Sequence, residues 1–325
     1  MRSAEQACFS DVQEAPGIGL CLVTLASVEV LMKKRKKVLL AGAHAPEDGK
    51  NKLYMKAFIE LLQHMAEKRR MILDLAKSDF RKRFVGSYFG IIWMFLQPLA
   101  TVTIYAFIFG PYGFKSAPPV PNTSYVIWLI PGLVPWFFFS ESLNTLTGIL
   151  QEYSYLVKKV VFPVELLPII KLASCFFVHL CFVAIMLVAF LVSGKPPMIS
   201  WLQIIYYSFA ASVLVLGIGY LTSAVNVFFK DMQQIVGICL QFGIWMCPIM
   251  YDETLFTSRA PWVGTLLKLN PLYYIVAGYR DSMLTGAGFW MRPTLGIYFW
   301  VVTLVIFFVG LSFFRKLRPH FSDVL

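Results

Sequence analysis

Two long apolar runs, at residues 124–150 and 164–192, flank a short polar and basic stretch, and this arrangement limits the possible folds most strongly. A helix needs about 20 apolar residues to cross the hydrocarbon core of a bilayer, so each run is long enough to span a membrane. The stretch between them, QEYSYLVKKVVFPVELLP (residues 151–168), must then lie at a membrane surface. Because short loops rich in Lys and Arg stay cytoplasmic, Lys158 and Lys159 predict that this central loop lies in the cytoplasm.

The composition agrees with a membrane location. Of the 325 residues, 58% are hydrophobic and 14% are charged, and the mean hydropathy is +0.67. Soluble domains carry about 25% charged residues, so this composition is typical of a protein embedded in lipid. The net charge of +11 is expected to reflect basic cytoplasmic segments and contact with anionic lipid headgroups. No soluble basic domain is visible in the sequence, so nucleic acid is not an expected partner.

Four further apolar runs complete the predicted topology. They lie at residues 88–109, 201–229, 235–250 and 294–314. Together with the two runs around the central loop, they predict six transmembrane helices within residues 86–325, in an all-α polytopic membrane protein. Lys and Arg gather near the span ends that this topology places inside, which predicts that both termini are cytoplasmic.

The first 85 residues are expected to contain two different parts. Residues 1–54 do not match the rest of the chain, and we expect a poorly ordered extension there, or an upstream start codon with initiation near Met55. The apolar run at residues 17–32 falls short of the roughly 20 residues that a span needs. Residues 55–85 combine apolar residues at helical spacing with many basic ones, which is typical of an amphipathic helix lying on the cytoplasmic leaflet. An ordinary solvated helix is the alternative.

Three consecutive basic residues, Arg81, Lys82 and Arg83, lie where this helix leads into the first span. A basic residue near a membrane surface attracts anionic headgroups by about 1 kcal/mol. We therefore expect these three residues to attract an anionic headgroup to the cytoplasmic mouth of a membrane path. The alternative is that they only orient the first span through the positive-inside rule.

The segment from residue 251 to residue 292 does not have the pattern of a simple span. Its most apolar part holds Lys268, Arg280 and Asp281, and burying such charges in lipid costs several kcal/mol each. We therefore predict a re-entrant outer segment made of short helices that dip into the outer leaflet and are covered by protein.

No catalytic or metal-binding motif appears in the sequence. The phosphate-binding pattern GxxxxGK[ST] is absent, as are HExxH and any CxxC pair among the six cysteines. We therefore expect no metal, no cofactor and no ATP hydrolysis by this chain. Two rival classes are a membrane-embedded glycosyl- or acyltransferase with a lipid-linked substrate and a secondary transporter driven by an ion gradient. The first needs convergent acids and bases and the second often shows an internal repeat, and the sequence shows neither.

Several separated motifs resemble those of type 2 ABC-transporter permeases that export surface polysaccharides such as O-antigen, capsule and teichoic acid. The motifs are DLAKSDFRKRFVGSYFGIIWMFLQPL (residues 74–99), YLVKKVVFPVELLP (residues 155–168) and NPLYYIVAGYRDSMLTG (residues 270–286). The final RKLRPHFSDVL is similar to the end of O-antigen exporters in particular. The resemblance covers residues 55–325 and leaves residues 1–54 outside.

The resemblance implies a permease subunit of the bacterial inner membrane that pairs with itself and with two copies of a separate ABC ATPase subunit. Its substrate would be a polysaccharide linked to undecaprenyl diphosphate, most closely O-antigen, which leaves from the cytoplasmic face. The central loop would dock on the ATPase. The loop residues expected to serve this contact are Glu152, Tyr153, Tyr155, Leu156, Lys158 and Lys159. The residues that match the family's re-entrant segment include Asn270, Pro271, Arg280 and Asp281.

A polysaccharide substrate makes polar and aromatic side chains in the spans candidates for a translocation path. Aromatic rings offer apolar faces that match the C–H faces of sugars, although placement toward lipid is the alternative for each of them. A carboxylate within a span usually faces a bundle interior or water, and a structural role is equally open. The candidate path residues are Tyr88, Trp93, Trp136, Glu141, Trp245 and Tyr251.

Overall fold

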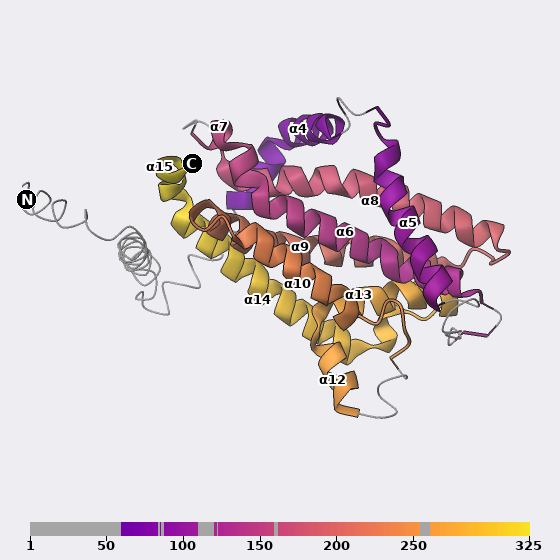
Figure 1. The fold of residues 1–325 in the computed structure, drawn as a ribbon. Helices are drawn as coiled ribbons and strands as arrows, with labels where there is room; N and C mark the ends of the chain where they lie inside the picture. Colours follow the sequence, from indigo (N-terminus) through magenta and orange to yellow (C-terminus); the bar gives the residue numbers. More distant parts are fainter. Residues whose placement is uncertain are drawn as a thin grey trace, which may run out of the picture. The chain divides into compact units, whose positions relative to one another are not determined.

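The computed structural model of the chain describes residues 60–83, 85, 88–109, 120–121, 123–158, 162–253 and 261–325. Within these residues all regular secondary structure is helical, which confirms the predicted all-α class (Figure 1). The extension predicted at residues 1–54 and the central-loop residue Lys159 lie outside the described residues.

Within the described residues, five helices are long and apolar enough to cross a membrane, so the chain is a multi-pass membrane protein. They correspond to five of the six predicted runs. The helices are α5 (Ile92–Phe109), α6 (Tyr125–Glu152), α8 (Leu167–Val192), α9 (Gln203–Phe228) and α14 (Pro293–Leu317).

The sixth predicted run, at residues 235–250, forms a shorter helix that ends just before Cys247 and Pro248. Helix α10 (Met232–Met246) has 15 residues, which corresponds to about 22 Å at 1.5 Å per residue, compared with a hydrocarbon core of about 30 Å. The following residues Cys247, Ile249 and Met250 are irregular but fully buried. Protein therefore covers backbone that lipid could not satisfy.

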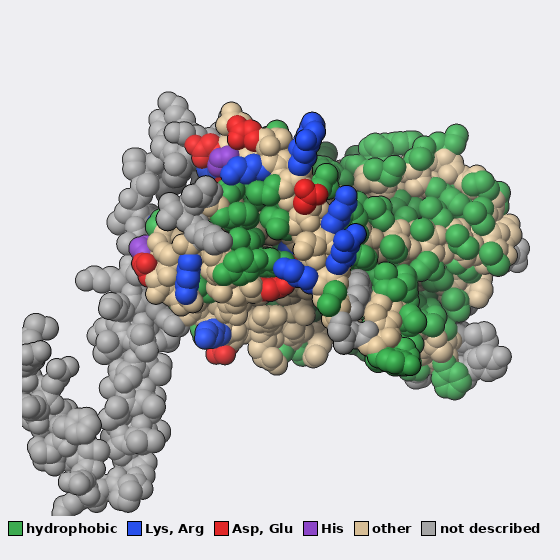
Figure 2. Space-filling view, turned by 90° about the horizontal axis from the view of Figure 1, so that it is seen from above, with side chains coloured by type: hydrophobic (Ala, Val, Ile, Leu, Met, Phe, Trp, Pro, Cys, Tyr) green, Lys and Arg blue, Asp and Glu red, His purple; other side chains and the backbone are tan. Residues whose placement is uncertain are grey.

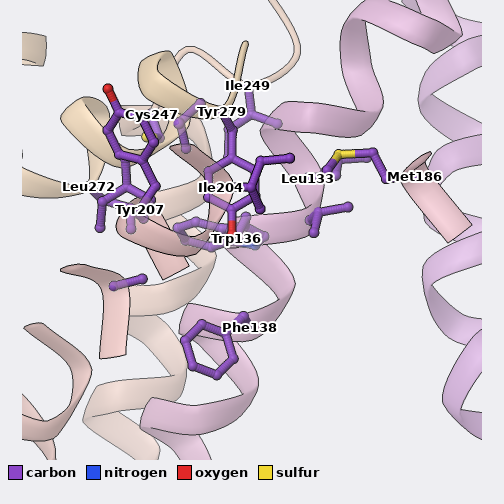
Figure 3. Packing of buried hydrophobic residues seen from close by; sticks show 14 of the residues in the cluster. Leu133, Trp136, Phe138, Met186, Ile204, Tyr207, Cys247, Ile249, Leu272 and Tyr279 are labelled. Carbon is purple, nitrogen blue, oxygen red and sulfur yellow. The ribbon is translucent and has the colours of Figure 1, made fainter. Parts of the chain in front are cut away.

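The region predicted to be re-entrant contains two short helices, α12 (Pro261–Leu269) and α13 (Pro271–Arg280), and then a π-helical turn (Asp281–Thr285). Asn270 caps α13 by accepting a 3.0 Å hydrogen bond from the N–H of Leu272. Helix α13 packs against α6, α9 and α14. Figure 3 shows this packing, where Trp136 of α6 and Tyr279 of α13 lie among the buried side chains.

Helices α9 and α14 approach each other most closely at two glycines. A Cβ atom on Gly310 would lie 2.2 Å from the carbonyl oxygen of Gly217, and a Cβ on Gly217 would lie 2.8 Å from Cα of Phe307. Only residues without a side chain allow two helix backbones to come this close. The α9–α14 pair is therefore packed backbone against backbone.

Charged side chains gather at one end of the bundle, which we call the charged end. Helix α4 (Arg69–Lys82), α7 (Ser154–Val157) and α15 (Phe321–Val324) all lie there (Figure 1). Figure 2 shows Lys and Arg over this end, whereas the surface toward the opposite end is mostly hydrophobic. Helix α4 packs along α8 through an apolar face that includes Ile72 and Ala76.

Candidate functional site

The central loop lies at the charged end and is folded into two short legs. The first leg contains the end of α6 and helix α7, and the second leg is the 3-10 turn η1 (Val164–Leu166). Pro163 precedes η1 in an extended conformation, and Pro168 lies in the first turn of α8, where a missing N–H breaks no helical hydrogen bond. Helical turns therefore extend into the loop from both sides.

The first leg is held by Asp79, whose carboxylate on α4 is 1% exposed. The Tyr153 hydroxyl donates a 2.7 Å hydrogen bond to Asp79 Oδ1, and Lys171 Nζ of α8 donates to the same oxygen at 2.9 Å. Lys171 also donates to Glu152 Oε2 at 2.8 Å. We call Asp79, Tyr153, Glu152 and Lys171 the Asp79 network. It joins α4, α8 and the first leg of the loop.

Two carboxylates, Asp79 and Glu152, share the single ammonium of Lys171 in the Asp79 network, and Arg83 lies 3.6 Å from Asp79. Burial alone would raise the pKa of Asp79, but the Ser174 hydroxyl and the Lys171 ammonium outweigh it and hold this pKa below its ordinary value. Burial and the neighbouring Asp79 raise the pKa of Tyr153, so its hydroxyl keeps its proton and remains a donor. A charged carboxylate, a charged ammonium and a neutral phenol thus hold the first leg at neutral pH.

The second leg is held by Glu165, which is 3% exposed. Its two carboxylate oxygens accept separate hydrogen bonds from Arg315 at 2.7 Å and from Arg318 at 2.9 Å. The Tyr220 hydroxyl of α9 donates to the Glu165 carbonyl at 2.8 Å, and Arg315 also donates to Glu60 at 3.0 Å. We call Glu165, Arg315, Arg318 and Glu60 the Glu165 network.

The predicted contact residues of the loop fall into two groups. Tyr155 is 53% exposed and Lys158 is exposed, whereas Leu156 is half-buried, so these side chains form an outward face on the first leg. Glu152 is half-exposed and bound to Lys171. Tyr153 is 6% exposed and bound to Asp79, so it holds the loop from inside and does not face outward.

The structure separates the three consecutive basic residues. Arg81 and Lys82 are exposed, as a headgroup-attracting surface requires. Arg83 instead turns inward and donates to the Glu141 carboxylate of α6 and, at 3.0 Å, to Cys175 Sγ of α8. Glu141 is therefore the partner of Arg83, a pairing between two predicted site residues that the sequence did not indicate.

The predicted path aromatics do not gather into one site within this chain. Trp136 is buried, whereas Tyr88, Trp93 and Trp245 are exposed. The Tyr251 hydroxyl donates to the Trp245 carbonyl at 2.7 Å. Since helix α5 has no buried residue at all, the surface with Trp93 is available for lipid or for another protein.

Arg280 and Asp281, in the region predicted to be re-entrant, have partners within the protein. The Arg280 guanidinium lies over the Trp128 ring, 3.7 Å from its centroid, and donates to the carbonyls of Pro248 and Ile249. These hydrogen bonds thus satisfy backbone carbonyls in the irregular stretch after α10. Asp281 forms an ion pair with Arg292 at 3.0 Å.

Sequence reasoning missed Asp79, Lys171 and Glu165, although a signal for the first was present. Asp79 follows Ile72 and Ala76 at helical spacing, so it lies on the buried face of α4. A charge at such a position must have a buried partner. No comparable spacing indicated that Lys171 would supply a buried partner or that Glu165 would need one.

The sequence matches one family of known proteins. The sequence model of the family described as ABC-2 type transporter matches residues 72–284. This range includes α4 from its first buried residue, both legs of the central loop and helix α13.

Curated relatives match at low identity over most of their length. The O-antigen export system permease protein RfbA of Klebsiella pneumoniae is 27% identical over 257 residues, which cover 78% of this chain and 95% of the relative. RfbA of Myxococcus xanthus is 25% identical, with 82% and 99% covered. The polysialic acid transport protein KpsM of Escherichia coli is 24% identical, with 73% and 89% covered.

Proposed function

The chain belongs to the ABC-2 type transporter family, and we propose that it is the permease subunit of an exporter of lipid-linked polysaccharide, most closely O-antigen. Permeases of this family have no catalytic site of their own and work with an ATPase subunit. In this proposal ATP is hydrolysed by the partner chain, and this chain provides the membrane path.

The relatives support the class of substrate. Two are O-antigen export permeases and one transports polysialic acid, so all three named cargoes are bacterial surface polysaccharides. The matches cover 89% or more of each relative, so the likeness extends over whole permeases. A glycosyl- or acyltransferase is disfavoured because Glu141 and Asp281 are each bound by an arginine.

The observation that carries the proposal is the state of the central loop. Both legs are fixed to the body of the protein through buried ion pairs, while Tyr155 and Lys158 remain exposed. A segment that transmits force from a partner needs both properties, because a mobile loop would absorb the displacement. Force on Tyr155 would reach α4 and α8 through the Asp79 network.

The finer assembly follows from the same proposal. The permease pairs with a second copy and with two ATPase subunits at the charged end, which is then the cytoplasmic end in the bacterial inner membrane, with both termini inside. Helix α10 and its buried continuation form the sixth crossing. The exposed Arg81 and Lys82 attract the undecaprenyl diphosphate headgroup, and the basic face of α4 lies against anionic lipid.

Substitution of Tyr155 tests the loop as the ATPase contact. We expect Tyr155→Asp in the tagged permease to abolish co-purification of the ATPase subunit and surface display of polysaccharide, because a carboxylate replaces the exposed ring. The matched control is Ile199→Asp, an apolar-to-acidic change at a residue that is 88% exposed at the opposite end. Normal ATPase recovery and export with Tyr155→Asp would refute the proposed contact.

A further inference from the structure

The last eleven residues fold back onto the central loop. We call residues 315–325 the C-terminal segment. It contains the end of α14, the turn η5 (Arg318–His320) and helix α15. Between this segment and the second leg lies an open pocket of about 480 Å³, lined on its two sides by Glu165 and Arg318 among others. The resemblance and the family match do not assign a role to this contact.

The contact between segment and loop is specific in its geometry. Each carboxylate oxygen of Glu165 is bound by a different guanidinium, one from the last turn of α14 and one from η5. Charge-assisted hydrogen bonds of this kind fix both distance and direction. An apolar contact would hold the second leg as tightly without fixing its orientation, and a buried ion pair is a poor device for stability alone.

The arginines are themselves held in place by the α9–α14 pair. Phe321 is fully buried and packs edge to face on Phe314, with a centroid distance of 5.2 Å, and against Phe228 at 6.1 Å. Phe228 is the last residue of α9. Because α9 and α14 meet backbone against backbone at Gly217 and Gly310, Arg315 and Arg318 extend from a rigid base.

We propose that Arg315 and Arg318 are positioning residues that fix the second leg of the central loop to the α9–α14 pair. The inference rests on the proposed function of the loop as the ATPase contact. A displacement of the loop then reaches two groups of helices together: α4 and α8 through the Asp79 network, and α9 and α14 through the Glu165 network. Release of the Glu165 network frees the Glu165 side chain from α14 and leaves the second leg held by the Tyr220 hydrogen bond and by its buried apolar residues, so that ATP hydrolysis is poorly converted into export.

The test uses the complete permease–ATPase complex. ATP hydrolysis is measured in phosphatidylethanolamine–phosphatidylglycerol vesicles. Export is measured as polysaccharide displayed on cells that carry the same variant. Arg318→Gln is the main variant, because its side chain is 41% exposed and its loss leaves Arg315 to cover Glu165. We expect normal recovery of the ATPase and continued hydrolysis, with export per ATP reduced roughly tenfold, a size usual for coupling between sites. Arg318→Lys should restore most of the coupling.

A second readout follows the loop itself. Trypsin cleaves after Lys158, which is exposed on the first leg, and a loop held by fewer hydrogen bonds is cut faster. We expect faster cleavage in Arg318→Gln than in the wild type. The matched control is Lys316→Gln, which changes an exposed residue in the last turn of α14, and we expect wild-type cleavage and export from it. Size-exclusion profiles in detergent show that each variant is folded.

Two results would overturn the inference. One is unchanged export per ATP in both Arg318→Gln and Glu165→Gln, provided that both are folded. The other is loss of ATPase recovery in Arg318→Gln, which would make the C-terminal segment a docking surface and not a positioning element. Failure of the proposed function is distinguishable, because then the wild-type permease itself would recover no ATPase.

Discussion

At the scale of single residues, Asp79 is the point where three separate parts of the chain meet. It receives hydrogen bonds from Tyr153 of the loop and from Lys171 of α8, and Arg83 lies 3.6 Å away. A buried carboxylate costs free energy unless its partners remain in place, so the position of each partner depends on the others. The loop is thereby bound to the membrane helices by chemistry that a single substitution can remove.

Asp79→Asn is predicted to destabilise the protein by about 1–3 kcal/mol, since it removes one charge of a buried pair and leaves a donor poorly matched. Thermal unfolding of the purified permease in detergent, followed by intrinsic fluorescence, measures the effect as a lower melting temperature. Asp74→Asn changes an exposed residue of the same helix and serves as control. Equal melting temperatures for the two variants would contradict the role of Asp79.

The stability difference between the wild type and Asp79→Asn is also expected to depend on pH. Because the pKa of Asp79 is lower in the folded than in the unfolded protein, its contribution to stability is present above the unfolded value of about 3.9 and is lost as the pH falls through the folded pKa. The difference in melting temperature between wild type and Asp79→Asn should stay constant from pH 8 to about pH 5. It should shrink below about pH 4.

At the scale of elements, apolar length and amphipathic spacing are enough to predict most helices. Five of the six runs became long helices because about 20 apolar residues in lipid have no alternative that satisfies their backbone. The run at residues 235–250 is broken at Cys247 and Pro248, and the contact that satisfies its broken backbone comes from Arg280, 32 residues beyond Pro248. Such a contact depends on tertiary structure and leaves no local pattern.

The candidate site was predictable only in part for the same reason. Lys158 and Tyr155 marked the loop because charge and flanking apolar runs are local features. The residues that fix the loop, Asp79 and Glu165, lie 74 and 150 positions from their partners Tyr153 and Arg315. Their pairing could not be found from spacing, and neither could the buried position of Tyr153.

Helix packing gives a prediction of its own at Gly310. Gly310→Ala should separate α9 from α14 and cost about 1–3 kcal/mol or more, because the new methyl group would meet the Gly217 carbonyl at 2.2 Å. Gly237→Ala in α10 meets nothing within 4 Å and is the matched control. The two variants are compared by their yield of monodisperse protein after detergent extraction and by their melting temperatures. Equal yields and melting temperatures would show that the α9–α14 contact is loose.

At the scale of the whole molecule, the charged end and the helix bundle beyond it are held together by different kinds of contact. The charged end holds the loop, α4 and the C-terminal segment through buried ion pairs, and the bundle beyond it combines an apolar core with buried polar contacts such as His179 with Ser208 and Tyr279. Helix α5 buries none of its residues in this chain, which leaves a membrane-facing surface for the second copy that we propose. In the proposed function, the permease moves only when the ATPase subunit acts on its charged end.

Reconstitution of the purified permease, with and without its ATPase subunit, tests this dependence most directly. Transfer of lipid-linked polysaccharide across the vesicle membrane is measured together with ATP hydrolysis. We predict neither transfer nor hydrolysis with the permease alone, and both once the ATPase is bound and ATP is supplied. Sustained transfer by the permease alone, driven by no ATPase, would contradict the account.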